Sequence, residues 1–385
     1  MNILYYLEYY PKLSESWIRS EIRQLRNEGH RVVVLAHKSP DSDVDDPANR
    51  SITLPSISFD GFKKFDPFST AFRGWASSPL PTIDPRYHLY TLYHASHARS
   101  TLQSLPFEIE HIHGHFVTVP QICAQHLADT IGVPHTVMSH AADLYAANDA
   151  MPRQYLYKNC DRLLTISDYN REFMEEESRE PINIEVLPAC FDFETFTPSD
   201  GHDKGRLLTV ARHTEKKGIS YALEAISHLY DDYEVEYRLV SDGPLTEDLK
   251  KQARTLGIQD SVNFLGRISD EELHEELDAA ELFVLPSVIA ENGDRDGIPV
   301  AIKEAMAMKT PPITTTVSGI PELVDESCGY LVPPRDSEAL ADVLTVALDE
   351  SHREKGEAAR NRIETHNSDV VVPQLLDVFS KISTS

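Results

Sequence analysis

Cysteine is scarce in this chain, and so are long apolar runs. The only four cysteines among 385 residues are Cys123, Cys160, Cys190 and Cys328. They form no C-x-x-C pair, so the sequence indicates neither a disulfide framework nor a thiolate metal site. No stretch approaches the roughly 18 consecutive apolar residues of a membrane-spanning helix. Residues 1–11 include Glu8 and no basic residue, unlike an export signal. We therefore expect reduced thiols and a cytoplasmic location.

Positive charge is also scarce. The chain carries 36 lysine and arginine residues against 62 aspartate and glutamate residues, a net charge of −26, and only 14 residues are lysines. This sign disfavours nucleic-acid binding and polybasic membrane anchoring. Self-repulsion would strain a compact fold in dilute buffer, but the Debye length of roughly 3 Å in molar salt removes most of it. We interpret the charge as halophilic, with an ordinary acidic protein as the alternative.

The pattern of the chain is that of an α/β protein. Its length exceeds the usual ~100–200 residues per domain, which predicts two domains. Short β-branched runs alternate with helical patterns throughout, as in parallel sheets built from βαβ units. In the first half the expected strands are 2–6, 31–36, 109–113, 135–139, 162–166 and 184–187. In the second half they are 206–211, 237–240, 262–265, 282–286, 312–315 and 330–332.

Two segments interrupt this alternation. Residues 39–85 lose the periodicity and are interpreted as a loop-rich excursion. Residues 191–205 are polar and contain Pro198, Gly201 and Gly205, as a linker does. The sequence therefore predicts two doubly wound, Rossmann-like parallel-sheet domains. They are residues 1–195 and 196–365, with a C-terminal helix at 366–385 that packs back on the first domain.

A polar loop that runs into a helix is the richest candidate site. Residues 291–307, ENGDRDGIPVAIKEAMA, place Pro299 near the first turn of that helix, where proline is favoured. The N–H groups of Gly297 and Ile298 would point, with the helix dipole, towards an anion. Glu304 follows on the same helix, and a carboxylate there suits hydroxyl donors such as a ribose diol. A phosphate with a sugar is the favoured ligand, and an ordinary loop-to-helix junction is the alternative.

Two more loops follow the first two strands of the second half. Arg212 and Lys217 come after one, and Asp242 and Gly243 after the next. Open α/β sheets bind ligands at the carboxyl ends of their strands. Basic residues clustered there, in so acidic a chain, indicate an arriving anion. Each charge-assisted contact to a phosphate contributes roughly 1.5–3 kcal/mol. Solvated turns are the alternative for both loops.

Several segments agree in order and spacing with one known family. They are YYPKLSESWIRSEIRQLRNEGH at 9–30, HGHF at 113–116, SHAADLY at 139–145, RHTEKKG at 212–218, DGIPVAIKEAMA at 296–307, SGIPELV at 318–324 and GYLVPP at 329–334. Together they resemble glycosyltransferase family 4, in its exopolysaccharide and colanic-acid-type branch. The resemblance covers nearly the whole chain. It implies the GT-B fold, with two domains facing a central cleft, and a reaction that retains the anomeric configuration.

The resemblance implies a role for each matching residue. Arg212 and Lys217 would hold the donor diphosphate and stabilise the leaving group. Asp296 stands at the first carboxylate of the E-x7-E motif, facing the transferred sugar, and Glu304 at the second, bonding the ribose. His140 matches the family's histidine near the donor sugar, with a core histidine as the alternative. Further donor contacts would come from Gly297, Ile298, Pro299, Asp242 and Gly243.

Some positions depart from the family or match it less directly. Asp296 is one methylene shorter than the usual glutamate, which bears on sugar choice. Lys309 stands where the family commonly has glycine after this helix. His113 and His115, in HGHF, are weaker site candidates, because that run also reads as the end of a strand.

A metal is not expected. Asp294-Arg295-Asp296 spells D-x-D, by which another glycosyltransferase fold holds a divalent metal. The residues at 41–43 spell it too, which shows how readily an acidic chain produces it. Because Arg212 and Lys217 are available to neutralise a diphosphate, we predict no metal and no other cofactor.

The expected reaction moves a hexose-type sugar from a nucleotide-diphosphate sugar to a hydroxyl of a glycan or lipid-linked glycan. By analogy alone, such an acceptor would bring the protein into peripheral contact with the cytoplasmic face of the membrane. A sugar-nucleotide epimerase of the same architecture is one alternative, with Asp296 as its strongest acid or base. A non-catalytic sugar-nucleotide binding protein is the other.

Overall fold

The computed structural model describes residues 1–12, 15–38, 51–56, 85–146, 151–199, 201–230 and 232–383. They form two compact units. Unit 1 is Met1–Phe191 together with Ser368–Ser385, and unit 2 is Asp192–Asn367. The end of the chain therefore belongs to the same unit as its beginning. Most of the predicted excursion at 39–85 lies outside the described residues.

Unit 1 is built on a seven-stranded sheet. Its order is β3-β2-β1-β4-β5-β6-β7, and every adjacent pair is parallel. The strands are β1 (Asn2–Tyr9), β2 (Arg31–Lys38), β3 (Ile52–Thr53), β4 (His111–His115), β5 (His135–Ser139), β6 (Arg162–Thr165) and β7 (Ile184–Val186). The strand order reverses between β1 and β4, the kind of position where open α/β sheets bind ligands beyond the carboxyl ends of their strands.

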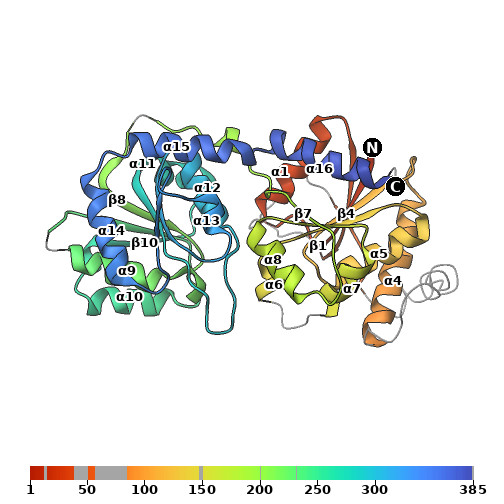
Figure 1. Cartoon of the computed structure of the whole chain (residues 1–385), viewed down its shortest axis with the longest axis horizontal. Helices are drawn as coiled ribbons and strands as arrows, with labels where there is room; N and C mark the ends of the chain where they lie inside the picture. Colours follow the sequence, from red (N-terminus) through yellow and green to blue (C-terminus); the bar gives the residue numbers. More distant parts are fainter. Residues whose placement is uncertain are drawn as a thin grey trace. The chain divides into compact units, whose positions relative to one another are not determined.

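Helices cover both faces of this sheet. They are α1 (Ser16–Asn27), α4 (Pro85–Leu102), α5 (Val119–Ile131), α6 (Ala142–Tyr145), α7 (Met151–Asn159), α8 (Asp168–Glu177) and α16 (Ser368–Ser383). Alternate residues of β1 serve the two faces. Ile3 and Tyr5 pack with α1 and α16, whereas Leu4 and Tyr6 pack with α5. Figure 1 shows α1 and α16 side by side on their face of the sheet.

Unit 2 repeats this plan with six parallel strands, in the order β10-β9-β8-β11-β12-β13. The strands are β8 (Asp203–Val210), β9 (Glu236–Val240), β10 (Val262–Gly266), β11 (Ala280–Leu285), β12 (Pro312–Thr315) and β13 (Tyr330–Val332). Here the order reverses between β8 and β11. The loops that follow β8, β9 and β11 therefore leave neighbouring strands at one edge of the sheet.

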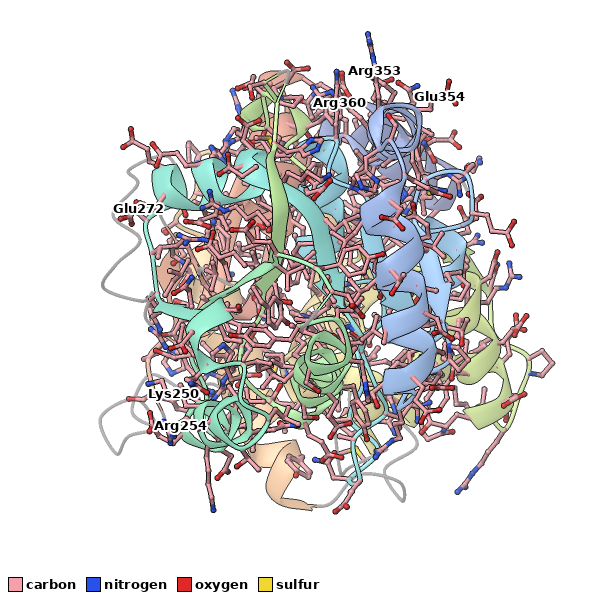
Figure 2. All side chains as sticks on the ribbon, turned by 90° about the vertical axis from the view of Figure 1, so that its left-hand side faces the viewer. Lys250, Arg254, Glu272, Arg353, Glu354 and Arg360 are labelled. Carbon is pink, nitrogen blue, oxygen red and sulfur yellow. The ribbon has the colours of Figure 1, made fainter. Side chains whose placement is uncertain are left out.

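The helices of unit 2 enclose an apolar core to which α9, α10 and α14 contribute. They are α9 (Ile219–Leu229), α10 (Thr246–Thr255), α11 (Asp270–Ala279), α12 (Val300–Ala307), α13 (Ile320–Leu323), α14 (Ser337–Asp349) and α15 (Arg353–Ile363). The short 3-10 turns are η3 (Phe193–Thr195), η4 (Glu215–Lys217), η5 (Gln259–Ser261) and η6 (Glu364–His366). Charged side chains project from the outer helices, such as Arg254 of α10, Glu272 of α11 and Arg353 of α15 (Figure 2). No helix among the described residues is long and apolar enough to cross a membrane.

The predicted α/β architecture with two parallel sheets is confirmed, but one strand is displaced. The strand expected at 109–113 is β4, His111–His115, two residues later. Its alternate residues His111, His113 and His115 are buried. Two of these rings find a partner in the interior, because His111 Nε2 and His113 Nδ1 lie 2.9 and 2.7 Å from the Thr136 hydroxyl. The polar segment HGHF therefore contains the end of a buried central strand, β4.

The starts of α1 and α12 are each set by the residues just before them. Glu15 is the N-cap of α1, and Ser16 is its first helical residue. The turn before it, in which the Glu15 N–H donates to the Lys12 carbonyl at 3.1 Å, runs directly into the helix. Pro299 is the N-cap of α12, immediately before its first turn, which agrees with the predicted position near that turn. At the other end of α12, Lys309 adopts the left-handed conformation, with φ at 61°, which explains why glycine suits that position.

Candidate functional site

Two lysines and two aspartates form the centre of a polar site in unit 2. Lys217 Nζ lies 2.7 Å from Asp296 Oδ2, and Lys216 Nζ lies 3.0 Å from Asp294 Oδ1 and 3.6 Å from Asp296 Oδ1. The Ser287 hydroxyl donates to Asp296 at 3.2 Å. Burial opposes ionisation of Asp296, but the two ammonium groups outweigh it and hold the Asp296 pKa below its ordinary value. Ion pairs thus tie the loop after β8 to the loop after β11.

A glycine lets these two loops approach. Gly218 ends η4 with φ at +63°, in the left-handed region that favours glycine. A Cβ at this position would lie 1.8 Å from the Pro286 carbonyl oxygen. The Val288 N–H also donates to the Lys216 carbonyl at 2.8 Å. The backbone of η4 is therefore packed directly on the end of β11. This contact fixes the backbone positions of Lys216 and Lys217.

The loop after β9 lies against the loop after β8. The His213 N–H donates to the Asp242 carbonyl at 3.1 Å, and a Cβ on Gly243 would lie 2.5 Å from the His213 carbonyl oxygen. The Asp242 carboxylate is 3.4 Å from Arg267, and both side chains are largely exposed. Arg212 is exposed as well, and it has no ion-pair partner within the described parts of the chain. An anion can therefore reach its guanidinium.

The start of α12 offers unpaired hydrogen-bonding groups. No described residue accepts the N–H of Gly297 or Ile298, which immediately precede the N-cap Pro299. Glu304, a little more than a turn into the helix, is half-buried, and no described group donates to its carboxylate. Burial, aided by the negative charge of Asp270, raises the Glu304 pKa to about 7. One segment thus provides two donors for an anion and a poorly solvated acceptor for hydroxyl groups.

His140 belongs to unit 1, where it follows β5. Its side chain is buried, with Nε2 3.0 Å from His115 Nδ1. Its N–H donates to Asp143 Oδ1 at 2.8 Å. Ring contacts to Trp17 and Phe116, at centroid distances of 5.5 and 4.8 Å, enclose the imidazole. This histidine therefore has a fixed orientation at the carboxyl edge of the sheet.

Comparison with known families decides what kind of protein carries these residues. Residues 14–195 match the description "Glycosyltransferase Family 4", and residues 204–350 match "Glycosyl transferases group 1". Residues 14–195 therefore form a glycosyltransferase family 4 domain, and residues 204–350 a glycosyl transferases group 1 domain. The family predicted from the sequence motifs is thereby confirmed.

Two curated proteins illustrate the similarity of this chain to known sequences. The amylovoran biosynthesis glycosyltransferase AmsK of Erwinia amylovora is 37% identical over 196 residues, which cover 47% of this chain and 46% of AmsK. The MMP alpha-(1->4)-mannosyltransferase of Mycolicibacterium hassiacum is 30% identical over 226 residues, 57% of this chain and 54% of that protein. The chain spans about half the length of the curated relatives it matches.

A solved structure shows that the fold is also shared. Anabaena Alr3699/HepE in complex with UDP-glucose superposes with a TM-score of 0.73 over 99% of this chain and 100% of that chain, at 14% identity. At this identity the likeness concerns the fold, and the GT-B fold predicted for the family 4 chain is confirmed.

Within unit 2, the predicted residues gather at one edge of the sheet. Lys217 contacts Asp296 directly, and the Asp242–Gly243 loop packs on the loop of Arg212. Sequence reasoning missed Lys216, whose ammonium group pairs with both carboxylates of the D-x-D tripeptide. The consecutive lysines of TEKKG were the available signal. Ser287 was also missed, and the sequence held no signal for it, because only the fold brings its side chain to Asp296.

Asp143, in the family 4 segment SHAADLY, supports the His140 loop and yields a stability prediction. Its buried carboxylate accepts the N–H groups of Val117 and His140 and the Ser139 hydroxyl. Burial raises its pKa to about 6, although these hydrogen bonds oppose the shift. Asp143→Ala leaves two buried amides without an acceptor. Because each unsatisfied group costs about 1–3 kcal/mol, we expect urea unfolding of unit 1 to show a loss of about 2–5 kcal/mol.

The control for this variant is Asp168→Ala, since Asp168 is an exposed residue of the same unit. It should change stability by no more than about 0.5 kcal/mol. The raised pKa of Asp143 also predicts how the stability of unit 1 changes with pH. A carboxyl group whose folded pKa exceeds its unfolded value favours folding while protonated, so its contribution is lost as pH rises through about 6. Asp143→Asn should remove that part of the pH dependence, and an unchanged pH profile would contradict the assignment.

Proposed function

We propose that this protein is a retaining, metal-independent glycosyltransferase. It moves a hexose-type sugar from a nucleotide-diphosphate sugar to a hydroxyl of a glycan or lipid-linked glycan. The observation that carries the proposal is the lysine and aspartate cluster of unit 2, beside the unpaired N–H groups before α12. The amylovoran enzyme and the structure with UDP-glucose support the acceptor and donor classes.

The proposed chemistry is positioning with electrostatic stabilisation. As the bond between the sugar and the diphosphate lengthens, negative charge builds on the leaving phosphate oxygen. Arg212, Lys217 and the N–H groups of Gly297 and Ile298 meet that charge. The acceptor hydroxyl attacks the anomeric carbon from the face the diphosphate leaves, and its proton passes to the departing phosphate. No nucleophilic carboxylate is required, and the configuration is retained.

Asp296 has two successive roles in this proposal. Without donor it holds Lys217, at 2.7 Å. When the diphosphate takes over Lys217, the Asp296 carboxylate becomes available to a hydroxyl of the transferred sugar. Its lowered pKa keeps it an acceptor. The same lowered pKa argues against a general acid at this position, and so against the sugar-nucleotide epimerase.

Metal independence is part of the proposal for an electrostatic reason. Both carboxylates of the D-x-D tripeptide already face an ammonium group. A divalent cation at that position would have to displace Lys216 and Lys217. Transfer should therefore continue at an unchanged rate in EDTA, and an absolute requirement for added Mg²⁺ would refute this part.

Binding of the donor should depend on pH through Glu304. If the ionised carboxylate accepts the ribose hydroxyls, a pKa of about 7 makes roughly a tenth of the protein competent at pH 6 and nine tenths at pH 8. The affinity for UDP-glucose, or for the nucleotide sugar that binds, should rise about tenfold between these values. Calorimetric titration measures this, and the diphosphate diester of a nucleotide sugar does not itself titrate in this range. Glu304→Gln should flatten the profile, and a profile that survives this variant would exclude Glu304.

Thermal unfolding in molar KCl with EDTA tests the proposed function directly. The ligands are UDP, GDP, ADP and TDP, each compared in wild type, Lys217→Ala and Glu304→Ala. A ligand at about 100 times its Kd adds about 2.7 kcal/mol, which appears as a Tm shift of a few degrees. A shift for one nucleotide that both variants lose supports the donor site and names the base. Absence of any shift in wild type would refute the proposal.

A further inference from the structure

Three side chains that can ligate a metal ion converge in the interior of unit 1. They are Glu21 of α1 and His113 and His115 of β4, and one ligand atom from each lies within 4.8 Å of the other two. The exposed fraction is 0% for Glu21, 0% for His113 and 2% for His115. The chemistry proposed for sugar transfer uses none of the three. Their convergence therefore calls for an explanation of its own.

The spacing of the two histidines directs both rings towards α1. Residues two apart on a strand point to the same face of the sheet, and His113 and His115 are two apart on β4. Glu21 meets them from α1, with Oε1 3.1 Å from His115 Nε2 and 3.6 Å from His113 Nε2. About 90 residues separate the helix from the strand in the sequence, so only the fold brings the carboxylate to the H-x-H segment.

These separations are those of ligand atoms around one ion. Zinc binds imidazole nitrogen and carboxylate oxygen at about 2.0–2.2 Å. Two such bonds that meet at the tetrahedral angle place their ligand atoms about 3.3 Å apart. The distances from Glu21 Oε1 to the two Nε2 atoms lie on either side of this value.

An unpartnered nitrogen points to the same position. His113 Nε2 is completely buried, yet it has no hydrogen-bond partner among the described residues. The other nitrogen of each ring is engaged, because His113 Nδ1 lies 2.7 Å from the Thr136 hydroxyl and His115 Nδ1 lies 3.0 Å from His140 Nε2. Histidines that ligate a metal are generally held by a hydrogen bond at their second nitrogen. In both rings Nε2 is then the nitrogen directed at Glu21.

The charge of Glu21 also favours a cation. Within the described ranges, no lysine or arginine pairs with this carboxylate. Its other contacts are the Tyr5 hydroxyl, 2.5 Å from Oε1, and the Cys190 thiol, 3.7 Å from Oε2. Burying an ionised carboxylate is costly unless it is paired or coordinates a metal. A divalent ion would supply the positive charge that these neighbours lack.

We propose that Glu21, His113 and His115 bind one zinc ion, which joins α1 to β4 and stabilises unit 1. Two imidazoles and a carboxylate suit zinc, whereas magnesium and calcium prefer oxygen ligands alone. The inference departs from the sequence prediction of no metal. It goes beyond the proposed function, because the metal independence of transfer concerns the D-x-D tripeptide of unit 2.

Hydrogen bonding is the competing explanation for the same contacts. The Tyr5 hydroxyl and His115 Nε2 can both donate to Glu21 Oε1 without any ion. That arrangement leaves His113 Nε2 without a partner. Metal analysis of the protein decides between the two explanations.

The first test counts the metal in the wild-type chain. The full chain is produced in medium with added zinc, without a polyhistidine tag and without chelator, and mass spectrometry measures its metals. We expect about one zinc per chain. X-ray absorption at the zinc edge should show nitrogen and oxygen ligands at about 2.0–2.2 Å, with outer-shell scattering from two imidazoles. A folded chain with less than about a tenth of a zinc ion, or a zinc ion ligated mainly by sulfur, would overturn the inference.

The second test assigns the ligands by substitution. Glu21→Gln, His113→Gln and His115→Gln should each lower the zinc content to a small fraction of the wild-type value. His111→Gln is the matched control, because His111 is buried on the same face of β4 and also contacts Thr136, at 2.9 Å, but has no ion-pair contact with Glu21 among the described residues. It should keep its zinc. Zinc retained in the three ligand variants, or lost equally from the control, would overturn the inference.

The third test measures what the ion does for stability. Wild-type chain is unfolded in guanidinium chloride with EDTA, refolded without metal, and compared with the zinc-loaded chain. Because zinc binds only the folded site, its removal should lower Tm by about 5–15 °C. One equivalent of zinc should restore the Tm, and magnesium should not. An unchanged Tm would overturn the structural role. The Tm shift caused by nucleotides is measured separately, and its absence would count against the proposed function alone.

Discussion

Lys217→Ala is expected to lower kcat by 100-fold or more, because one preorganised charge at the site of developing negative charge typically contributes 10²–10³ in rate. The geometry makes Lys217 better placed than an ordinary surface lysine. Its ammonium group is mostly buried and is held at 2.7 Å by Asp296, so little reorganisation is needed when a phosphate replaces that carboxylate. Arg212→Ala should show a loss of similar size.

The control for this prediction is Lys250→Ala, on the outer face of α10 (Figure 2). Lys250 forms an i,i+3 ion pair with the exposed Glu247 and lies 5.8 Å from the centroid of the Phe264 ring. Exposed ion pairs of this kind contribute little. Initial rates with saturating donor and acceptor, at several salt concentrations, measure the effect. If Lys217→Ala and Arg212→Ala both turn over at near-wild-type rates, the assignment of the donor site is wrong.

Gly218→Ala is expected to cause the largest loss of stability in unit 2, more than about 4 kcal/mol, which is exceptional for one substitution. The added Cβ would lie 1.8 Å from the Pro286 carbonyl oxygen. The added Cβ is bonded directly to the backbone next to η4, and the oxygen belongs to the backbone of Pro286. Neither atom can move away without separating η4 from the end of β11. Unfolding in urea measures the loss, and the displaced η4 should also weaken nucleotide binding.

Gly257→Ala is the matched control, because it separates backbone conformation from steric contact. Gly257 also has a positive φ, +75°, but a Cβ there would meet nothing within 4 Å. It should cost only about 1 kcal/mol. Equal losses in the two variants would show that close packing at Gly218 does not define the site.

Local sequence signals predicted the elements they control. Helix α11 begins at such a signal, since Ser269 and Glu272 form a reciprocal capping box at its start. Helix α9 shows the apolar stripe of an amphipathic helix, and that stripe faces the core. The prediction placed strand β4 two residues too early, because its histidines are buried and one ring nitrogen each of His111 and His113 contacts Thr136, on a different strand. Composition and periodicity carry no information about such a partner.

The candidate site was predictable in its residue types and less so in its connections. Motif spacing identified Lys217, Asp296 and Glu304, because each stands at a fixed distance from a strand end or a helix start. The pairing of Lys216 with both aspartates depends on how two loops meet, which Gly218 and Pro286 determine through the fold. The same applies to Glu21 and His115, which are 94 residues apart and share one hydrogen bond.

In the ion cluster of unit 2, Asp294 and Asp296 occupy the two lysines that a donor phosphate would bind. Two ammonium groups and two carboxylates cancel, so the resting loops carry their own counterions. In the proposed function, donor binding is then an exchange, in which the donor phosphate replaces an aspartate carboxylate beside each lysine. A tethered carboxylate acts at a high effective concentration. Chloride or inorganic phosphate competes with it for the lysines through charge alone. A nucleotide sugar makes further contacts through its base, ribose and hexose. We therefore expect its diphosphate to displace the aspartate carboxylates from the lysines, whereas a simple anion does not.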